Sequence, residues 1–187
     1  MGMDVYGIAP IIRTEKPASI DFDSATESEK KDYFEADREY ERANPGVYFR
    51  ANLWSWRPIH LIIDVVNEAH RLGIDTSSFG YNDGGGVKDV DTCKLLAKGI
   101  REKMVEPLVK KEIETIYVDF GSWRDNDGCL LSTEKMKELK IDKHKGILTT
   151  GLVTDSGEIV YPSHSIDVDY LEQFCCFLDE CGGFEIW

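Results

Sequence analysis

The chain has 187 residues, of which 42% are hydrophobic and 30% charged, as in an ordinary folded protein. Acidic residues number 35 and basic residues 22, giving a formal net charge of −13. That charge argues against nucleic-acid binding, because phosphate contacts need Lys and Arg, and it favours a protein partner of basic character. The most apolar stretch, 59–66, contains His60 and Asp64, so no membrane-spanning segment is expected.

The N-terminal residues lack the positive start and apolar middle of a secretion signal. The five cysteines cannot all pair and are too sparse for a disulfide scaffold. These features predict a cytoplasmic protein, and the length predicts one domain over residues 1–187.

A short strand is expected at Met3–Ile8. Residues 14–45 then form a strongly charged segment that opens with two overlapping capping-box patterns, Ser24 with Glu27 and Thr26 with Glu29. The segment has few apolar positions, so we expect an exposed acidic helical insertion and not a second domain.

Two helices are predicted in the middle of the chain. The first runs from Pro58 to Leu72 and stops at Gly73, with a core face made of Ile59, Ile62, Ile63, Val66 and Ala69. The second begins after a cap by Asp89 or Asp91. Its core stripe is Cys93, Leu96, Ile100, Met104 and Leu108, with a kink or an early end expected at Pro107.

Strand patterns dominate the next part of the chain. Ile113–Phe120 alternates apolar and polar residues, and Ile147–Val153 with Glu158–Tyr161 forms a hairpin pattern around Thr154-Asp155-Ser156-Gly157. We expect these strands to share a sheet. A helix capped by Asp167 with Leu171, Phe174, Cys175 and Leu178 on its core face follows, then a last strand at Phe184–Trp187. The irregular order predicts an α+β fold, a small mostly antiparallel sheet packed against about three helices.

The Trp-rich segment 48–58 is a candidate ligand site. Alternate side chains of an extended segment share a face, so Arg50, Asn52, Trp54 and Trp56 would point the same way, followed by Arg57. Indole and guanidinium groups on one face can stack on a planar or sugar-like ligand and hold an anion. The other interpretation makes both tryptophans core residues.

A second candidate is the loop Tyr81-Asn82-Asp83-Gly84-Gly85-Gly86, which leads into a helix where backbone N–H groups can hold an anion. It lacks the Lys-Ser or Lys-Thr of a phosphate loop, and it equally fits an ordinary glycine-rich turn. If the chain returns along the preceding helix, Tyr81, Asn82 and Asp83 would join the Trp-rich segment.

No metal site or cofactor is expected. Asp125-Asn126-Asp127-Gly128 overlays part of a calcium loop, but Trp123 stands at the first ligand position and a strand precedes it. The cysteines and histidines lack the spacing of zinc ligands, and Cys175 lies on a helix core stripe.

Three patches carry a resemblance: 48–58 (Tyr-Phe-Arg-Ala-Asn-Leu-Trp-Ser-Trp-Arg-Pro), Tyr81-Asn82-Asp83-Gly84, and Phe174-Cys175 through Gly182-Gly183-Phe184-Glu185-Ile186. With the Met-Gly-Met-Asp start, they resemble an uncharacterised family of small bacterial and phage proteins. This sequence departs from the pattern at Ala51 and Ser55 and in its acidic insertion. The resemblance implies an origin and no established activity.

Two hypotheses follow. The first is a non-catalytic protein-binding accessory factor of phage or mobile-element type, supported by the acidic charge and the charged insertion. The alternative is a small-ligand-binding protein or enzyme whose pocket combines the Trp-rich segment with the Tyr-Asn-Asp-Gly loop.

Overall fold

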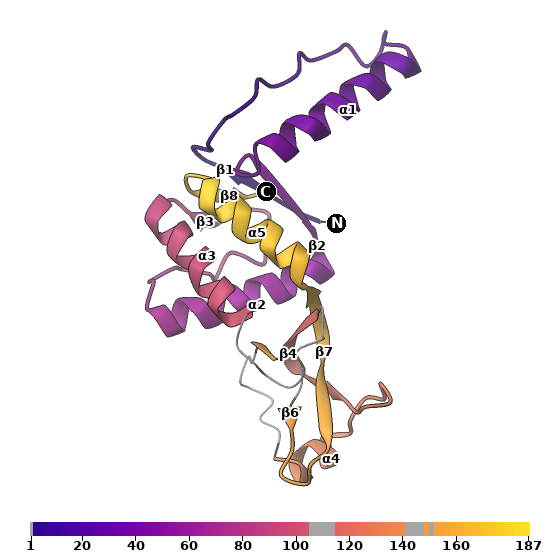
Figure 1. The fold of residues 1–187 in the computed structure, drawn as a ribbon, viewed down its shortest axis with the longest axis vertical. Helices are drawn as coiled ribbons and strands as arrows, with labels where there is room; N and C mark the ends of the chain where they lie inside the picture. The colour runs from indigo at the N-terminus through magenta and orange to yellow at the C-terminus, as the bar shows by residue number, and fades with distance from the viewer. Residues whose placement is uncertain (1, 105–114, 141–147, 150–151) are drawn as a thin grey trace.

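The structure is a computed structural model that describes residues 2–104, 115–140, 148–149 and 152–187. Figure 1 shows three parts along the longest axis. A helical arm extends at one end, a sheet with three helices forms the middle, and a second sheet lies at the other end. The protein has an α+β fold.

The first sheet joins both ends of the chain. Its strands are β1 (Gly2–Gly7), β2 (Tyr48–Asn52), β3 (Gly86–Val87) and β8 (Phe184–Ile186), in the antiparallel order β2-β1-β8-β3. Val5 lies opposite both Phe49 and Ile186, and all three are buried. Alternation along the strands therefore gives this sheet one buried face.

Three helices pack against that face: α2 (Leu53–His70), α3 (Val90–Met104) and α5 (Val168–Glu180). Their apolar stripes bury Ile59, Ile62, Ile63, Val66, Cys93, Leu96, Ile100, Leu171, Phe174, Cys175 and Leu178 in one core. A Cβ at Gly99 would lie 2.4 Å from Cγ1 of Val66, so this glycine permits the close approach of α3 to α2. Arg101 ties α3 to α5 through ion pairs with Glu172 and Asp179.

The second sheet contains β4 (Thr115–Arg124), β5 (Leu148–Thr149), β6 (Leu152–Val153) and β7 (Ile159–Asp167), in the order β5-β4-β7-β6. A short helix, α4 (Thr133–Glu138), completes a small core of Trp123, Met136 and Val160. Strand β7 carries Val160 in this core and Ile166 in the main one, so it connects the two.

The arm consists of residues 14–43 and ends in α1 (Glu27–Ala43). Thr26 caps α1, because its side chain accepts from the N–H of Glu29 while the Glu29 carboxylate accepts from the N–H of Thr26. Of the two overlapping capping patterns, the structure uses the second. No residue of the arm is buried.

Several predicted elements are confirmed. The strands at both ends, the hairpin between β6 and β7 and the helix after Asp167 are present, and Asp89 caps α3 by accepting from the N–H of Thr92 at 2.7 Å. The strand predicted from Ile113 pairs with β5 and β7 as expected, although residues 113 and 114 lie outside the described part. Pro107 and Leu108 lie outside it as well.

The middle strands share one antiparallel sheet, as predicted, and the end strands pair with each other in a separate antiparallel sheet.

The predicted bounds of the first middle helix are wrong. Helix α2 begins at Leu53 and not at Pro58, because Asn52 caps it one and a half turns earlier, and Pro58 lies inside the helix. The helix ends at His70, where Arg71 and not Gly73 takes the left-handed C-cap, and Ala69 is exposed.

The described helices include none with the length and apolar character that a membrane-spanning helix needs.

Candidate functional site

The Trp-rich segment divides into a strand and a helix at Leu53. The Asn52 side chain accepts from the N–H groups of Trp54 at 2.9 Å and Ser55 at 3.0 Å. Asn52 therefore starts α2 by satisfying two helix N–H groups that have no partner within the helix.

This change of conformation separates the two tryptophans. Trp56 is 1% exposed, and its Nε1 donates to the Phe79 carbonyl oxygen at 2.6 Å. Trp54 is 70% exposed, and the Arg57 guanidinium lies 5.2 Å from the centre of its ring. The prediction that the side chains of the Trp-rich segment share one face was wrong. Trp54 and Trp56 lie on a helix, where side chains two residues apart point in different directions. Trp56 belongs to the core, and Trp54 with Arg57 to the surface.

The Tyr-Asn-Asp-Gly loop contacts the first sheet through Asn82 and through Gly84, whose N–H donates to the Ile186 carbonyl oxygen of β8 at 2.8 Å. Nδ2 of Asn82 donates to the Gly2 carbonyl oxygen at 3.0 Å, and Gly2 lies opposite Asn52 in the strand pair. Tyr81 and Asp83 are exposed. Gly84 has a φ of +85° and faces the Trp187 ring, so the glycine serves a tight turn against the C-terminus. The loop thus reaches the beginning of the Trp-rich segment through Asn82.

A shallow pocket of about 480 Å³ lies where β2 leads into α2. It is lined by Gly2, Arg50, Asn52, Ser55 and Tyr170. Three of these, Gly2, Ser55 and Tyr170, were not among the site residues predicted from the sequence. Tyr170 belongs to α5 and is far away in the sequence, and its hydroxyl donates to the Arg50 carbonyl oxygen at 2.7 Å. Burial raises the pKa of Tyr170 to about 12, so this phenol stays a donor at neutral pH.

Charges around this pocket balance locally. Arg50 is exposed, and its Nε lies 3.7 Å from Oδ1 of Asp4 on the neighbouring strand. The same carboxylate oxygen accepts from the Tyr48 hydroxyl, and burial together with this hydrogen bond raises the pKa of Tyr48. The Arg50–Asp4 ion pair contributes little to stability, because it is exposed to water. The same exposure leaves the Arg50 guanidinium accessible at the pocket.

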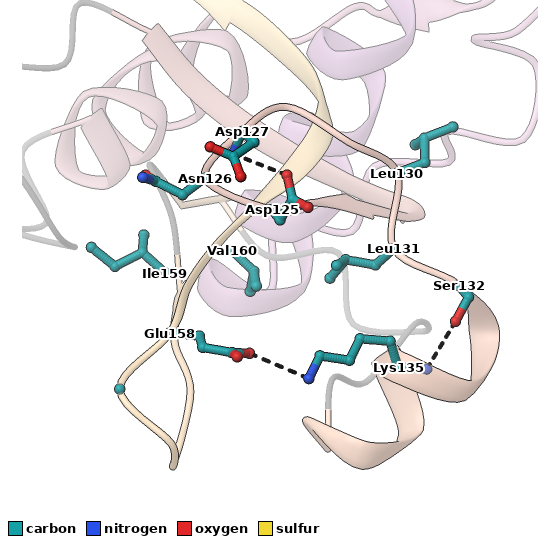
Figure 2. Close-up of a pocket in the computed structure, with 11 residues that line it drawn as sticks. Asp125, Asn126, Asp127, Leu130, Leu131, Ser132, Lys135, Glu158, Ile159 and Val160 are labelled. Carbon is teal, nitrogen blue, oxygen red and sulfur yellow. Dashed lines mark hydrogen bonds and ion pairs between the residues drawn. The ribbon is translucent and has the colours of Figure 1, made fainter.

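A larger pocket of about 650 Å³ lies beside the second sheet (Figure 2). One wall is formed by Asp125, Asn126 and Asp127, and another carries Lys135 with its ion pair to Glu158 at 3.7 Å. Oδ1 of Asp125 already accepts from the N–H groups of Asp127 and Cys129. This is the geometry of a turn, and it occupies the carboxylate that a calcium loop would need. Among the described residues, no three His, Cys, Asp or Glu side chains form a group able to hold a metal ion.

The cysteines are free thiols, and three of them, Cys93, Cys175 and Cys181, are buried. Burial raises the pKa of Cys175 to about 12. A thiol that stays protonated is a poor nucleophile, so Cys175 acts as a small core residue.

The arm contributes no residue to the main core. Its base is fixed by Asn44, which is fully buried and whose side chain holds Arg13, Thr14 and Tyr40 by hydrogen bonds. The Arg13 guanidinium also pairs with Glu180 at the end of α5. Long-range contacts of this kind anchor the arm where it leaves the body.

Farther out, three aromatic side chains gather on the arm. The Phe22 ring lies 5.4 Å from Tyr33 and 5.6 Å from Phe34, measured between ring centres. Phe22 remains 42% exposed and Phe34 50% exposed. These residues form an aromatic cluster (Phe22, Tyr33, Phe34) that keeps the extended stretch against α1 while leaving apolar surface in contact with water.

Comparison of the chain with family models, with curated proteins and with solved structures finds no match.

Proposed function

We propose that the protein is a non-catalytic protein-binding accessory factor that engages its partner through the arm. One observation carries the proposal: the arm is fixed at its base by hydrogen bonds to the buried Asn44 side chain, yet none of its own residues is buried. An ordered helix that contributes nothing to its own core loses conformational entropy without compensating burial. Burial against a second protein would supply that compensation.

The surface of the arm defines the class of partner. Helix α1 carries seven acidic and four basic residues, and the whole chain has a net charge of −13. The aromatic cluster provides exposed apolar area within this acidic surface. A basic protein surface with an apolar centre would match both properties, because charge steers the encounter and apolar burial holds the complex.

A phage or mobile-element origin, implied by the resemblance, fits a factor that acts by binding a host or phage protein. Five free thiols suit a reducing compartment, and we place this binding in the cytoplasm.

The test is affinity capture from an extract of the encoding organism, with purified wild-type chain and a Phe22→Ser, Phe34→Ser double variant. We expect one protein to be retained at near-stoichiometric yield by the wild type and lost by the double variant. Leu95→Ser is a matched control, since Leu95 is 51% exposed on α3, outside the arm. Equal retention by all three chains would remove the arm from the interaction.

The alternative, a small-ligand-binding protein or enzyme, is favoured by one observation. An exposed Trp54 stacked with Arg57 follows directly on the pocket residues Arg50 and Asn52. A planar anionic ligand could stack on the indole and pair with the guanidinium groups. Titration of the purified chain with a library of planar anionic metabolites, followed by Trp fluorescence, should then give saturable quenching that Trp54→Ala abolishes.

A further inference from the structure

Within the part of the chain that the structure describes, strand β2 forms one edge of the first sheet, since it pairs there with β1 alone. The hydrogen bonds of β1 show which way the N–H and C=O groups of β2 point. The N–H and C=O of Asp4 bond to the C=O and N–H of Trp187, so Asp4 faces away from β2. Arg50 lies opposite Asp4 and, in an antiparallel pair of this type, must point its own N–H and C=O outward.

The hydroxyl of Tyr170 confirms this direction, because it donates to the Arg50 carbonyl oxygen from the outer side. Strand periodicity gives Tyr48 the same outward orientation as Arg50. At Tyr48 and Arg50 the edge therefore presents backbone donors and acceptors, and the Tyr170 hydroxyl bonds to one of them, the Arg50 carbonyl oxygen.

Two hollows lie along this edge. The larger, of about 710 Å³, separates α1 from α5 and has Pro45, Tyr48 and Phe49 in its lining. Its walls carry charges of both signs, from Arg38, Glu41 and Arg42 on α1 and from Asp169 and Glu172 on α5. The smaller is the pocket at Arg50 and Asn52. A strand laid along the edge would pass the larger hollow beside Tyr48 and the smaller one beside Arg50.

We propose that the edge formed by Tyr48–Asn52 is a docking site for an extended segment of the protein partner, which adds to the sheet beside β2. This inference rests on the proposed protein-binding function and locates a second contact next to the base of the arm. Outward backbone groups select an extended polypeptide, because only another backbone matches a row of donors and acceptors at strand spacing.

The larger hollow indicates the side chain that the segment would bring. Pro45, Tyr48 and Phe49 offer an apolar and aromatic lining between the charged walls. An apolar or aromatic side chain of the segment can be buried there, with basic and acidic neighbours pairing with the walls. The proposed partner is therefore an extended segment with one apolar anchor.

The experiment uses the purified full chain and a phage-displayed library of random short peptides as the probe. Enriched peptides are synthesised, and their affinities are measured against the wild type, Arg50→Pro and Arg50→Ala. Arg50→Pro removes an outward N–H without breaking the ladder to β1, a position at which edge strands tolerate proline. Arg50→Ala removes the guanidinium and keeps the N–H, so it is the matched control.

We expect peptides with an apolar anchor to be enriched and to bind Arg50→Pro about tenfold more weakly than Arg50→Ala, the effect of one lost hydrogen bond. Amide hydrogen exchange at Tyr48 and Arg50 in the wild type should slow on peptide binding. This second measurement decides the question even if Arg50→Pro does not fold.

Three results would overturn the inference: no enrichment of any peptide, equal affinities for both variants with unchanged exchange at β2, or a wild-type dimer that Arg50→Pro dissociates. The last would assign the edge to a second copy of the chain. The Phe22→Ser, Phe34→Ser variant should still bind the peptides. Arm-dependent capture of a partner can thus succeed where the edge fails, which distinguishes the two proposals.

Discussion

The indole Nε1 of Trp56 donates a hydrogen bond to the carbonyl oxygen of Phe79, 2.6 Å away, and both residues are buried. This contact joins the first turns of α2 to the loop that precedes Tyr81. Trp56 thus positions the two candidate segments relative to each other from inside the core, and it is not available to stack on a ligand.

Replacing Trp56 by Ala should lower the free energy of unfolding by about 3 to 5 kcal/mol, the usual loss for a large buried aromatic. Urea denaturation followed by circular dichroism would measure it. Trp54→Ala is the control and should change stability by less than about 0.5 kcal/mol, since that ring is 70% exposed. A larger loss for Trp54 than for Trp56 would contradict the assignment of core and surface.

Asn44→Ala should destabilise the protein by about 2 to 3 kcal/mol, because it removes several part-buried hydrogen bonds at the base of the arm, each contributing about 1 kcal/mol. Its Oδ1 accepts from the N–H groups of Arg13 and Thr14, and its Nδ2 donates to the Tyr40 carbonyl oxygen. Thermal unfolding would measure the effect. Thr14→Val removes only the bond from Nδ2 to the Thr14 hydroxyl and should cost about 1 kcal/mol. Equal effects of the two changes would show that the backbone bonds contribute nothing.

Replacement of residues 19–39 by a short Gly-Ser linker should leave a folded protein with a cooperative transition, because no residue of the arm is buried. Thr14 and Tyr40 bond to the same nitrogen of Asn44, so a linker can follow soon after the base. Differential scanning calorimetry would compare the variant with the wild type. Loss of the cooperative transition would show that the arm belongs to the core.

The Arg13–Glu180 pair should make stability depend on pH in the acid range. A hydrogen bond from Arg13 lowers the pKa of Glu180 below its usual value, so the ionised form is favoured in the folded state. The stabilisation is present above the ordinary pKa of Glu and is lost as the pH falls through the lowered one. Most of it is screened by water, because the Arg13 side chain is 49% exposed.

Glu180→Gln should therefore flatten the fall of melting temperature between neutral and acid pH, with little change elsewhere. Glu68→Gln, an exposed carboxylate on α2, is the control and should keep the wild-type slope. An unchanged slope in Glu180→Gln would assign the acid dependence to other carboxylates.

Local features of the sequence were sufficient for much of the secondary structure. The 3.6-residue spacing of Ile59, Ile62, Ile63 and Val66 predicted the core face of α2, and the turn Thr154–Gly157 predicted the hairpin. Asn52 could also have been recognised as a cap, because Asn before a helix is a common start signal. The helix start was instead predicted at Pro58, since proline more often begins a helix than lies inside one.

Tertiary structure alone decided the candidate surfaces. Nothing near Tyr170 in the sequence indicates that its hydroxyl bonds to Arg50, 120 positions away, or that Asn44 holds Arg13 and Thr14. The sequence by itself determined the α+β class, the helix stripes and the exposed acidic helix, because periodicity and capping act between neighbours along the chain. Pairing of β1 with β8, burial of Trp56 and exposure of the β2 edge depend on contacts between distant segments, and those arise only when the whole core assembles.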